Sequence, residues 1–213
     1  MAEWTLSAEQ FAALWYSPAH DRMPFPFRFR SRFAYVDEYD RFRQDIQKAV
    51  KAPQHEKLRR ALFVLATPDA RLEVFGFTAG NELRHIACTR ANNAVLATQT
   101  PAPDGGNIRL TALPTQRVAE TLAAAVPVDR PGHSPARRFT RTDLESDAAP
   151  YTSAAHTIPA RRQYQRLTRT ADTGTIHISD GPRHGNPVTR RLRWFDIPDD
   201  GCYLEKRSST EIS

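Results

Sequence analysis

Two runs of short strand-like segments dominate the chain, and only the first run is followed by a helical pattern. The first run has four segments: residues 71–77, 83–90, 94–99 and 107–112. The second run has three segments: residues 174–179, 188–196 and 202–205. The connections are short and rich in glycine, proline and asparagine, which favours antiparallel neighbours. A helical pattern covers residues 115–126, whereas the second run ends in the polar residues 207–213.

Helical patterns precede and separate the two runs. Ser7 and Gln10 fit a capping box for a first helix, which Pro18 ends. Apolar spacing predicts four more helices: residues 37–50, 55–65, 142–150 and 161–169. This order predicts an α+β protein with a central antiparallel β-sheet flanked by helices, in a quasi-two-fold arrangement of two related halves. The halves are expected at residues 1–127 and 128–213.

Residues 24–33, PFPFRFRSRF, alternate strictly between phenylalanine and arginine. This period of two predicts a half-buried strand. Pro24 and Pro26 cannot donate ladder hydrogen bonds, so the strand is expected at a sheet edge. The phenylalanines and arginines would lie on opposite faces. A nucleic-acid base stacked on the aromatic face would therefore not meet the arginines of the same strand.

The basic composition nevertheless keeps a nucleic-acid-binding module as the alternative function. The net charge is +6, and the sequence pI is about 9.7. Of the 30 basic residues, four are lysines and the other 26 are arginines, spread through every segment. This spread is typical of a GC-rich genome as much as of a binding footprint. Nucleic acid is therefore the second candidate partner, and protein the first.

No catalytic, phosphate-binding or metal-binding motif occurs in the sequence. His177 near Ser179 and Asp180 is the nearest approach to a catalytic set, and a hydrolase is the least favoured hypothesis. Cys88 and Cys202 have no ligand spacing and are expected to be reduced thiols. No apolar stretch approaches the ~18 residues of a membrane span, and no secretory signal begins the chain. The sequence favours a binding scaffold over an enzyme.

Six segments carry a resemblance to a known family: WTLSAEQFAALW (4–15), PFPFRFRSRF (24–33), ARLEVFGF (70–77), NIRLTALPTQRVAETLAAAVP (107–127), TGTIHISDG (173–181) and RLRWFDIPDDGCYL (191–204). In order and pattern they resemble the EspG family, the ESX (type VII) secretion-associated proteins of actinobacteria. The resemblance implies a quasi-two-fold α+β fold. It also implies a cytoplasmic chaperone that binds the helical tip of a PPE protein within a PE–PPE pair and keeps the pair soluble for export.

The resemblance implies no catalytic activity, cofactor, metal, small-molecule substrate or membrane insertion, and makes other ESX components further partners. It places partner contacts on the loop between the first two ladder strands and on the hairpin of the second run. The expected partner-binding residues are Thr78, Ala79, Gly80, Asn81, Glu82, Leu83, Arg84, Trp194 and Tyr203. Family members usually continue into another strand and helix, so an open sheet edge is expected after Leu204, covered by residues 205–213 or by a partner.

Overall fold

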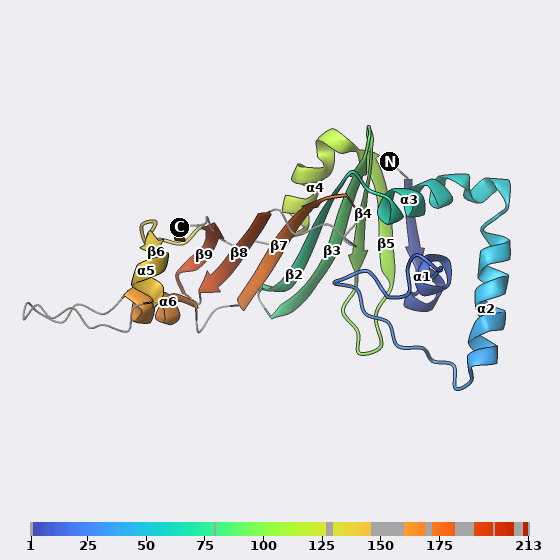
Figure 1. The fold of residues 1–213 in the computed structure, drawn as a ribbon, viewed down its shortest axis with the longest axis horizontal. Coiled ribbons are helices and arrows are strands. Elements are labelled where there is room, and N and C mark those ends of the chain that lie inside the picture. The colour runs from blue at the N-terminus through green and yellow to red at the C-terminus, as the bar shows by residue number, and fades with distance from the viewer. Residues whose placement is uncertain are drawn as a thin grey trace, which may run out of the picture.

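An eight-stranded antiparallel sheet forms the centre of the protein and confirms the expected α+β class. The computed structural model describes residues 2–78, 80–126, 130–145, 160–168, 172–181, 190–197, 199–206 and 211–212. The strand order is β1-β5-β4-β3-β2-β7-β8-β9 (Figure 1). The strands are β1 (Ala2–Leu6), β2 (Ala70–Thr78), β3 (Asn81–Arg90), β4 (Asn93–Gln99), β5 (Ile108–Pro114), β7 (Asp172–Asp180), β8 (Arg190–Ile197) and β9 (Gly201–Lys206).

β2 and β7 join the two predicted runs of strands into one continuous sheet. Their antiparallel register pairs Ala70 with Asp180 and Gly76 with Gly174. The first run therefore forms β2 to β5, and the second forms β7 to β9, as the strand-like patterns and short connections predicted. The division of the chain into residues 1–127 and 128–213 and the two-fold relation between the halves remain predictions.

The N-terminal helix begins at its predicted cap. In α1 (Ala8–Trp15), the Gln10 amide donates to Ser7 Oγ over 3.1 Å, and the Ser7 amide donates to Gln10 Oε1 over 2.9 Å. β1 was not predicted. It pairs with β5 from Ala2 opposite Ala112 to Leu6 opposite Ile108, and its inward residues alternate with exposed ones. Five residues give too short an alternation to distinguish a strand from a chain terminus.

The predicted edge strand at residues 24–33 is wrong, because this segment forms no ladder. The alternation itself is real: Phe27 is buried, while Arg28, Arg30 and Arg32 are exposed. The segment instead runs as a loop across the sheet and is attached mainly by side chains. We call residues 24–33 the aromatic–arginine segment.

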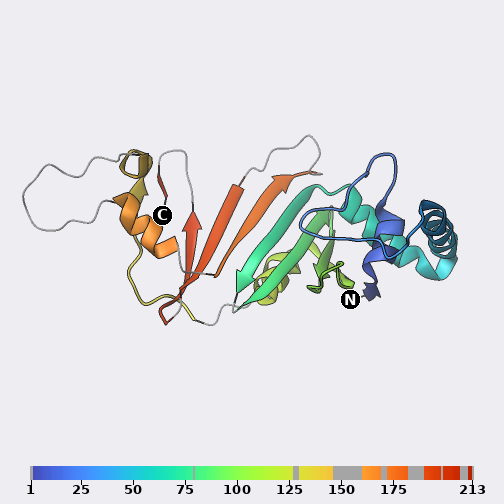
Figure 2. The same ribbon diagram turned by 90° about the horizontal axis from the view of Figure 1, so that it is seen from below.

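The helices lie at the two ends of the sheet and on both of its faces (Figures 1 and 2). Besides α1 they are α2 (Val36–Ala49), α3 (Glu56–Ala66), α4 (Val118–Ala125), α5 (Arg141–Glu145) and α6 (Ala160–Thr168), with short 3-10 turns η1 (Pro53–His55) and η2 (Thr115–Arg117). Every predicted helix is confirmed in place. Residues 146–150 and 169 of the predicted helices lie outside the described part of the chain, as do residues 188–189 of the second run.

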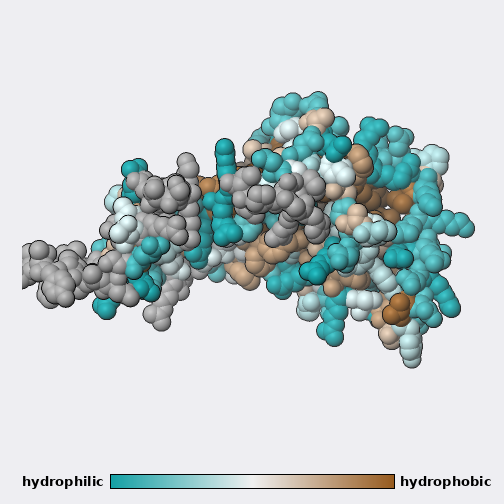
Figure 3. Space-filling view, in the orientation of Figure 1, coloured by the Kyte–Doolittle hydropathy of each residue, from teal (hydrophilic) through white to brown (hydrophobic). Residues whose placement is uncertain are grey.

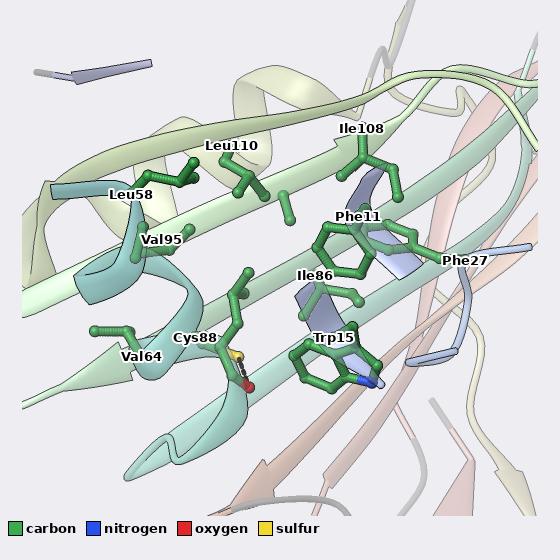
Figure 4. Close-up of a cluster of buried hydrophobic side chains, with 13 residues drawn as sticks. Phe11, Trp15, Phe27, Leu58, Val64, Ile86, Cys88, Val95, Ile108 and Leu110 are labelled. Carbon is green, nitrogen blue, oxygen red and sulfur yellow. Dashed lines mark hydrogen bonds between the residues drawn. The ribbon is translucent and has the colours of Figure 1, made fainter. Parts of the chain in front are cut away.

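One hydrophobic core lies under α1, α3 and the aromatic–arginine segment (Figure 4). Phe11 packs in parallel on Trp15 and edge-on against Phe27, with ring centroids 5.7 and 5.8 Å apart. These rings cover β3, β4 and β5 through residues such as Ile86 and Ile108, both almost fully buried. We call this side, which faces the viewer in Figure 1, the front face of the sheet.

α4 covers the back face with a second core. Val118 and Leu122 of α4 pack with residues of β2, β3 and β4 that point away from the first core, such as Val74 and Leu96. Figure 2 shows α4 on one side of the sheet and α3 on the other. Helices therefore cover both faces of the sheet at β3 and β4. These helices do not cover the part of the sheet toward β8.

The C-terminal residues pair away from the main sheet. β10 (Glu211–Ile212) joins β6 (Phe139–Thr140) in a separate two-stranded sheet. The described part of residues 205–213 beyond β9 therefore does not extend the main sheet, and β9 is its last strand, as expected for the edge near Leu204. Part of that edge is occupied by another segment, because Gly132 and Cys202 share an amide-to-carbonyl hydrogen bond of 3.0 Å and Pro131 bridges to Cys202.

Candidate functional site: a pocket on the open part of the sheet

A pocket of about 440 Å³ lies on the front face over β2, β7 and β8. Aromatic rings from β2, Phe75 and Phe77, line one side, and Arg191 and Arg193 from β8 line the other. β7, which lies between these two strands, contributes small residues such as Thr175, so the side chains at the bottom of the pocket are short. We call this the sheet pocket. Figure 3 shows apolar surface over β2 and β7, beside the wider N-terminal part of the molecule.

Register explains why these residues share a face. Side chains alternate across a strand, so residues directly opposite one another in neighbouring strands point the same way. Phe75 lies opposite Thr175, and Thr175 lies opposite Arg193. The pocket is therefore a direct product of the β2–β7–β8 pairing.

Arg191 and Arg193 have no carboxylate within 4 Å among the described residues, unlike many arginines of the chain. Arg193 lies over the ring of Phe195, with its guanidinium carbon 4.4 Å from the centroid. An arginine on an aromatic face still has its hydrogen-bonding edge available. The pocket therefore combines apolar surface with two guanidinium groups that form no ion pair with a described acidic side chain, although Glu205 also lines the pocket.

The exposed arginines of the aromatic–arginine segment are different, because each has an acidic neighbour. Arg28 lies 3.7 Å from Glu82, Arg30 lies 3.9 Å from Asp104, and Arg32 lies 3.4 Å from Glu9. Such pairs reduce the positive potential that a phosphate backbone would meet. The structure therefore gives the nucleic-acid alternative no support at the segment that suggested it.

A buried ion pair adjoins the sheet pocket on β2. Arg71 Nε donates to Glu73 Oε1 over 2.9 Å, and both side chains are at most 5% exposed. Arg71 also donates to the carbonyl of Phe25 over 3.2 Å, and Glu73 Oε2 lies 3.9 Å from His177 Nδ1. These contacts fix the start of the aromatic–arginine segment against the sheet. Phe25 in turn packs on Phe75, with centroids 5.5 Å apart.

A second polar cluster supports the β2–β3 turn. Arg84 is 2% exposed and donates to Glu82 over 2.6 Å and to Gln99 Oε1 over 3.2 Å. Glu82 also pairs with Arg28, so the turn, the buried strand β4 and the aromatic–arginine segment are linked. Sequence alternation could place Arg84 on a face but could not show that this face is buried.

The turn expected to contact a partner lies beside the sheet pocket. Gly80 has φ of +74° and is exposed, as is Asn81, and the Gly80 amide donates to Asp172 Oδ2 over 2.7 Å. Thr78 is 3% exposed and closes β2. Ala79 lies outside the described residues. The turn thus offers the exposed backbone of residues 80–81 and the Asn81 side chain at the end of the pocket where β7 begins.

The other expected contact residues are distributed over both faces. Leu83 and Trp194 are buried on the back face, where the Trp194 indole donates to the Phe77 carbonyl over 3.2 Å. Arg84 is buried on the front face. These three side chains therefore pack beneath the surface. Tyr203 is half-buried on the front face of β9.

Tyr203 belongs to a hydrogen-bonded cluster at the β8–β9 turn. Its hydroxyl donates to Asp200 Oδ2 over 2.6 Å and accepts from the Ser134 amide over 2.9 Å. The His133 amide donates to Asp200 Oδ1 over 2.8 Å. The Tyr203 and His133 hydrogen bonds lower the pKa of Asp200. The cluster holds residues 131–134 against β9 beside a second, mainly apolar pocket of about 330 Å³, which Phe139 of β6 and Tyr164 of α6 also line.

The catalytic hypothesis gains nothing from the geometry. Ser179 and His177 share the front face, but the carboxylate beside His177 is Glu73, which is bound by Arg71, and not Asp180. Burial raises the pKa of the Cys88 thiol to about 11, which keeps it an unreactive core residue. Among the described residues, no cluster of three His, Cys, Asp or Glu side chains could hold a metal ion.

The fold and this surface define an α+β protein whose open sheet face is suited to binding another macromolecule. The chain belongs to the EspG family, whose model matches residues 7–211, and it is therefore an ESX secretion-associated protein. No curated protein matches the sequence. None of the described helices has the length and apolar character needed to cross a membrane.

Proposed function

We propose that this protein is a cytosolic, non-catalytic chaperone of ESX (type VII) secretion that binds a PPE protein within a PE–PPE pair and keeps the pair soluble for export. Other ESX components are further candidate partners. Family membership supports the secretion role. The observation that carries the binding role is the sheet pocket, in which Phe77 is 43% exposed beside two arginines that pair with no carboxylate of the described residues.

An exposed aromatic residue in a concave site is suited to burying an apolar tip. Burial of a phenylalanine-sized group contributes about 1.5–3 kcal/mol, so a few such contacts account for specific binding of an otherwise aggregation-prone helix end. The β2–β3 turn at residues 80–81 and the Tyr203 side of β9 flank the pocket. These are the accessible residues among those that the family resemblance implies.

The test is co-expression with PE–PPE pairs encoded in the same genome, followed by size-exclusion chromatography. We expect one pair to co-elute with the chain and to precipitate without it. Phe77→Ser removes apolar surface from the pocket and should abolish co-elution. Phe63→Ser is the matched control, because Phe63 is 53% exposed on α3, outside the pocket lining. The proposal fails if every pair is soluble alone and none co-elutes.

A further inference from the structure

We infer that the sheet pocket selects a helical segment in which an apolar side chain is accompanied by a carboxylate one to two turns away. The apolar group would pack on Phe75 and Phe77, and the carboxylate would bind Arg191 and Arg193. This inference rests on the proposed function, because it specifies the chemistry of the partner tip.

The positive charge of the pocket favours a carboxylate on the partner. Arg191 is exposed and Arg193 is half-buried, and both point to the front face from one strand. Two guanidinium groups that pair with no described carboxylate form a strong binding site for one, because guanidinium donates paired, parallel hydrogen bonds to a carboxylate. Partial exclusion of water by the pocket walls strengthens that attraction.

The nearest acidic residue is already engaged. Glu205 lies directly opposite Arg193 in the β8–β9 register, yet its Oε2 accepts the Tyr164 hydroxyl over 2.8 Å. Glu205 is 5% exposed and is held toward α6. Arg193 instead lies on the ring of Phe195. Arg193 therefore makes no ion pair with Glu205, the acidic residue opposite it, and its guanidinium group can bind a carboxylate of another molecule.

The spacing of the pocket sets the spacing in the partner. Phe75 and Arg193 are two strands apart in one row, which places their Cα atoms about 10 Å apart at ~4.8 Å per strand. A helix rises ~5.4 Å per turn. A partner helix that lies across the strands would therefore contact Phe75 and Arg193 with two of its own residues about one to two turns apart. The spacing can be shorter than the Cα separation because arginine side chains extend toward the centre of the pocket.

The test uses helical-hairpin scaffolds that present the same two leucines and differ only in one residue about two turns further on: Asp, Asn or Arg. Binding of each labelled scaffold to the full chain is measured by fluorescence anisotropy. We expect the Asp scaffold to bind about ten-fold more tightly than the Asn scaffold, with the Arg scaffold weakest. The preference should diminish as salt is raised.

A double variant, Arg191→Glu with Arg193→Glu, should reverse the order so that the Arg scaffold binds best. Arg190→Glu is the control for position, because it makes one such charge reversal on the same strand, one residue along and on the opposite face. Circular dichroism and thermal melting check that the double variant is folded. Phe77→Ser should weaken all three scaffolds alike.

Binding of none of the scaffolds, or equal binding of the Asp and Arg scaffolds, would overturn the inference. So would an unchanged order in the double variant when it is folded. The proposed function fails separately. A clear Asp preference without co-elution of any PE–PPE pair would leave the pocket chemistry standing and remove the PPE partner.

Discussion

The side-chain amide of Gln99 binds the backbone of Arg28 as a neighbouring strand would. Gln99 Oε1 accepts from the Arg28 amide over 2.8 Å, and Gln99 Nε2 donates to the Arg28 carbonyl over 2.6 Å. Gln99 is 1% exposed, so a buried side chain makes both of these bonds. One side chain thereby replaces the ladder that residues 24–33 do not form.

Gln99→Ala should destabilise the protein by about 2 kcal/mol, because it leaves buried polar groups of the backbone without partners. Urea unfolding measures the loss, and hydrogen exchange should show faster exchange in residues 27–30. Gln116→Ala is the control, since the Gln116 amide makes an exposed hydrogen bond to Asn92. Equal, small effects of the two substitutions would contradict this role of Gln99.

The Arg71–Glu73 pair predicts non-additive substitutions. Arg71→Met should cost about 3–5 kcal/mol, because it leaves the Glu73 carboxylate buried and without its main partner. Adding Glu73→Leu should recover part of that loss. Arg60→Met removes an exposed pair with Glu56 and should cost less than about 1 kcal/mol. Urea unfolding of the wild type, Arg71→Met, Glu73→Leu and the double variant completes the cycle, and a double variant less stable than Arg71→Met would refute the prediction.

Trp194 requires a glycine beneath it. A Cβ at Gly174 would collide with the Trp194 ring, so Gly174→Val should displace the indole and destabilise the sheet by about 2–4 kcal/mol. The indole N–H signal of Trp194 in NMR should shift as its bond to Phe77 is lost. Thr173→Val, one residue earlier and on the opposite face, should leave that signal in place. An unshifted signal in Gly174→Val would show that the packing adapts.

His85 predicts a pH dependence of stability. Burial, assisted by the positive charge of Arg109, lowers its pKa from 6.5 to about 4. The unfolded chain therefore binds more protons between these values, so stability is full above pH ~6.5 and falls as the pH drops toward 4. The loss attributable to His85 is about 3 kcal/mol.

Urea unfolding at pH 7 and pH 4.5 measures this loss, and His85→Gln should show a smaller drop than the wild type. His133→Gln, which changes a side chain that is 71% exposed, should keep the wild-type drop. An identical pH dependence in His85→Gln would assign the effect to other groups.

Local sequence patterns predicted most helices and strands of the fold. They could not predict the buried charged and polar contacts, because those depend on how the strands pair. The capping box at Ser7, the Gly80 turn and the β8–β9 turn each lie where short-range signals placed them. The alternation at residues 24–33 correctly placed Phe27 inside and the three arginines outside, although Phe25 is 36% exposed. It could not reveal that Gln99, far along the chain, would bind the backbone of this segment.

The sequence likewise predicted only part of the candidate site. The sequence indicated a turn at residues 78–82 and a second-run hairpin but could not show that Arg84 and Trp194 are buried. Nor could it show that Arg193 pairs with no carboxylate in the described part of the chain, because that depends on Glu205 being bound by Tyr164. The alternation of Phe75 and Phe77 in β2 was a usable signal for the pocket, since the two rings fall on one face.

The most direct test of the account is a hydrogen-exchange comparison of the chain alone and in its co-purified PE–PPE complex. Binding in the sheet pocket predicts slowed exchange in residues 75–78, 80–82 and 191–195, with α2 and its surroundings unchanged. Protection confined to α2 and α3, with no change in β2 and β8, would contradict the placement of the partner on the open face of the sheet.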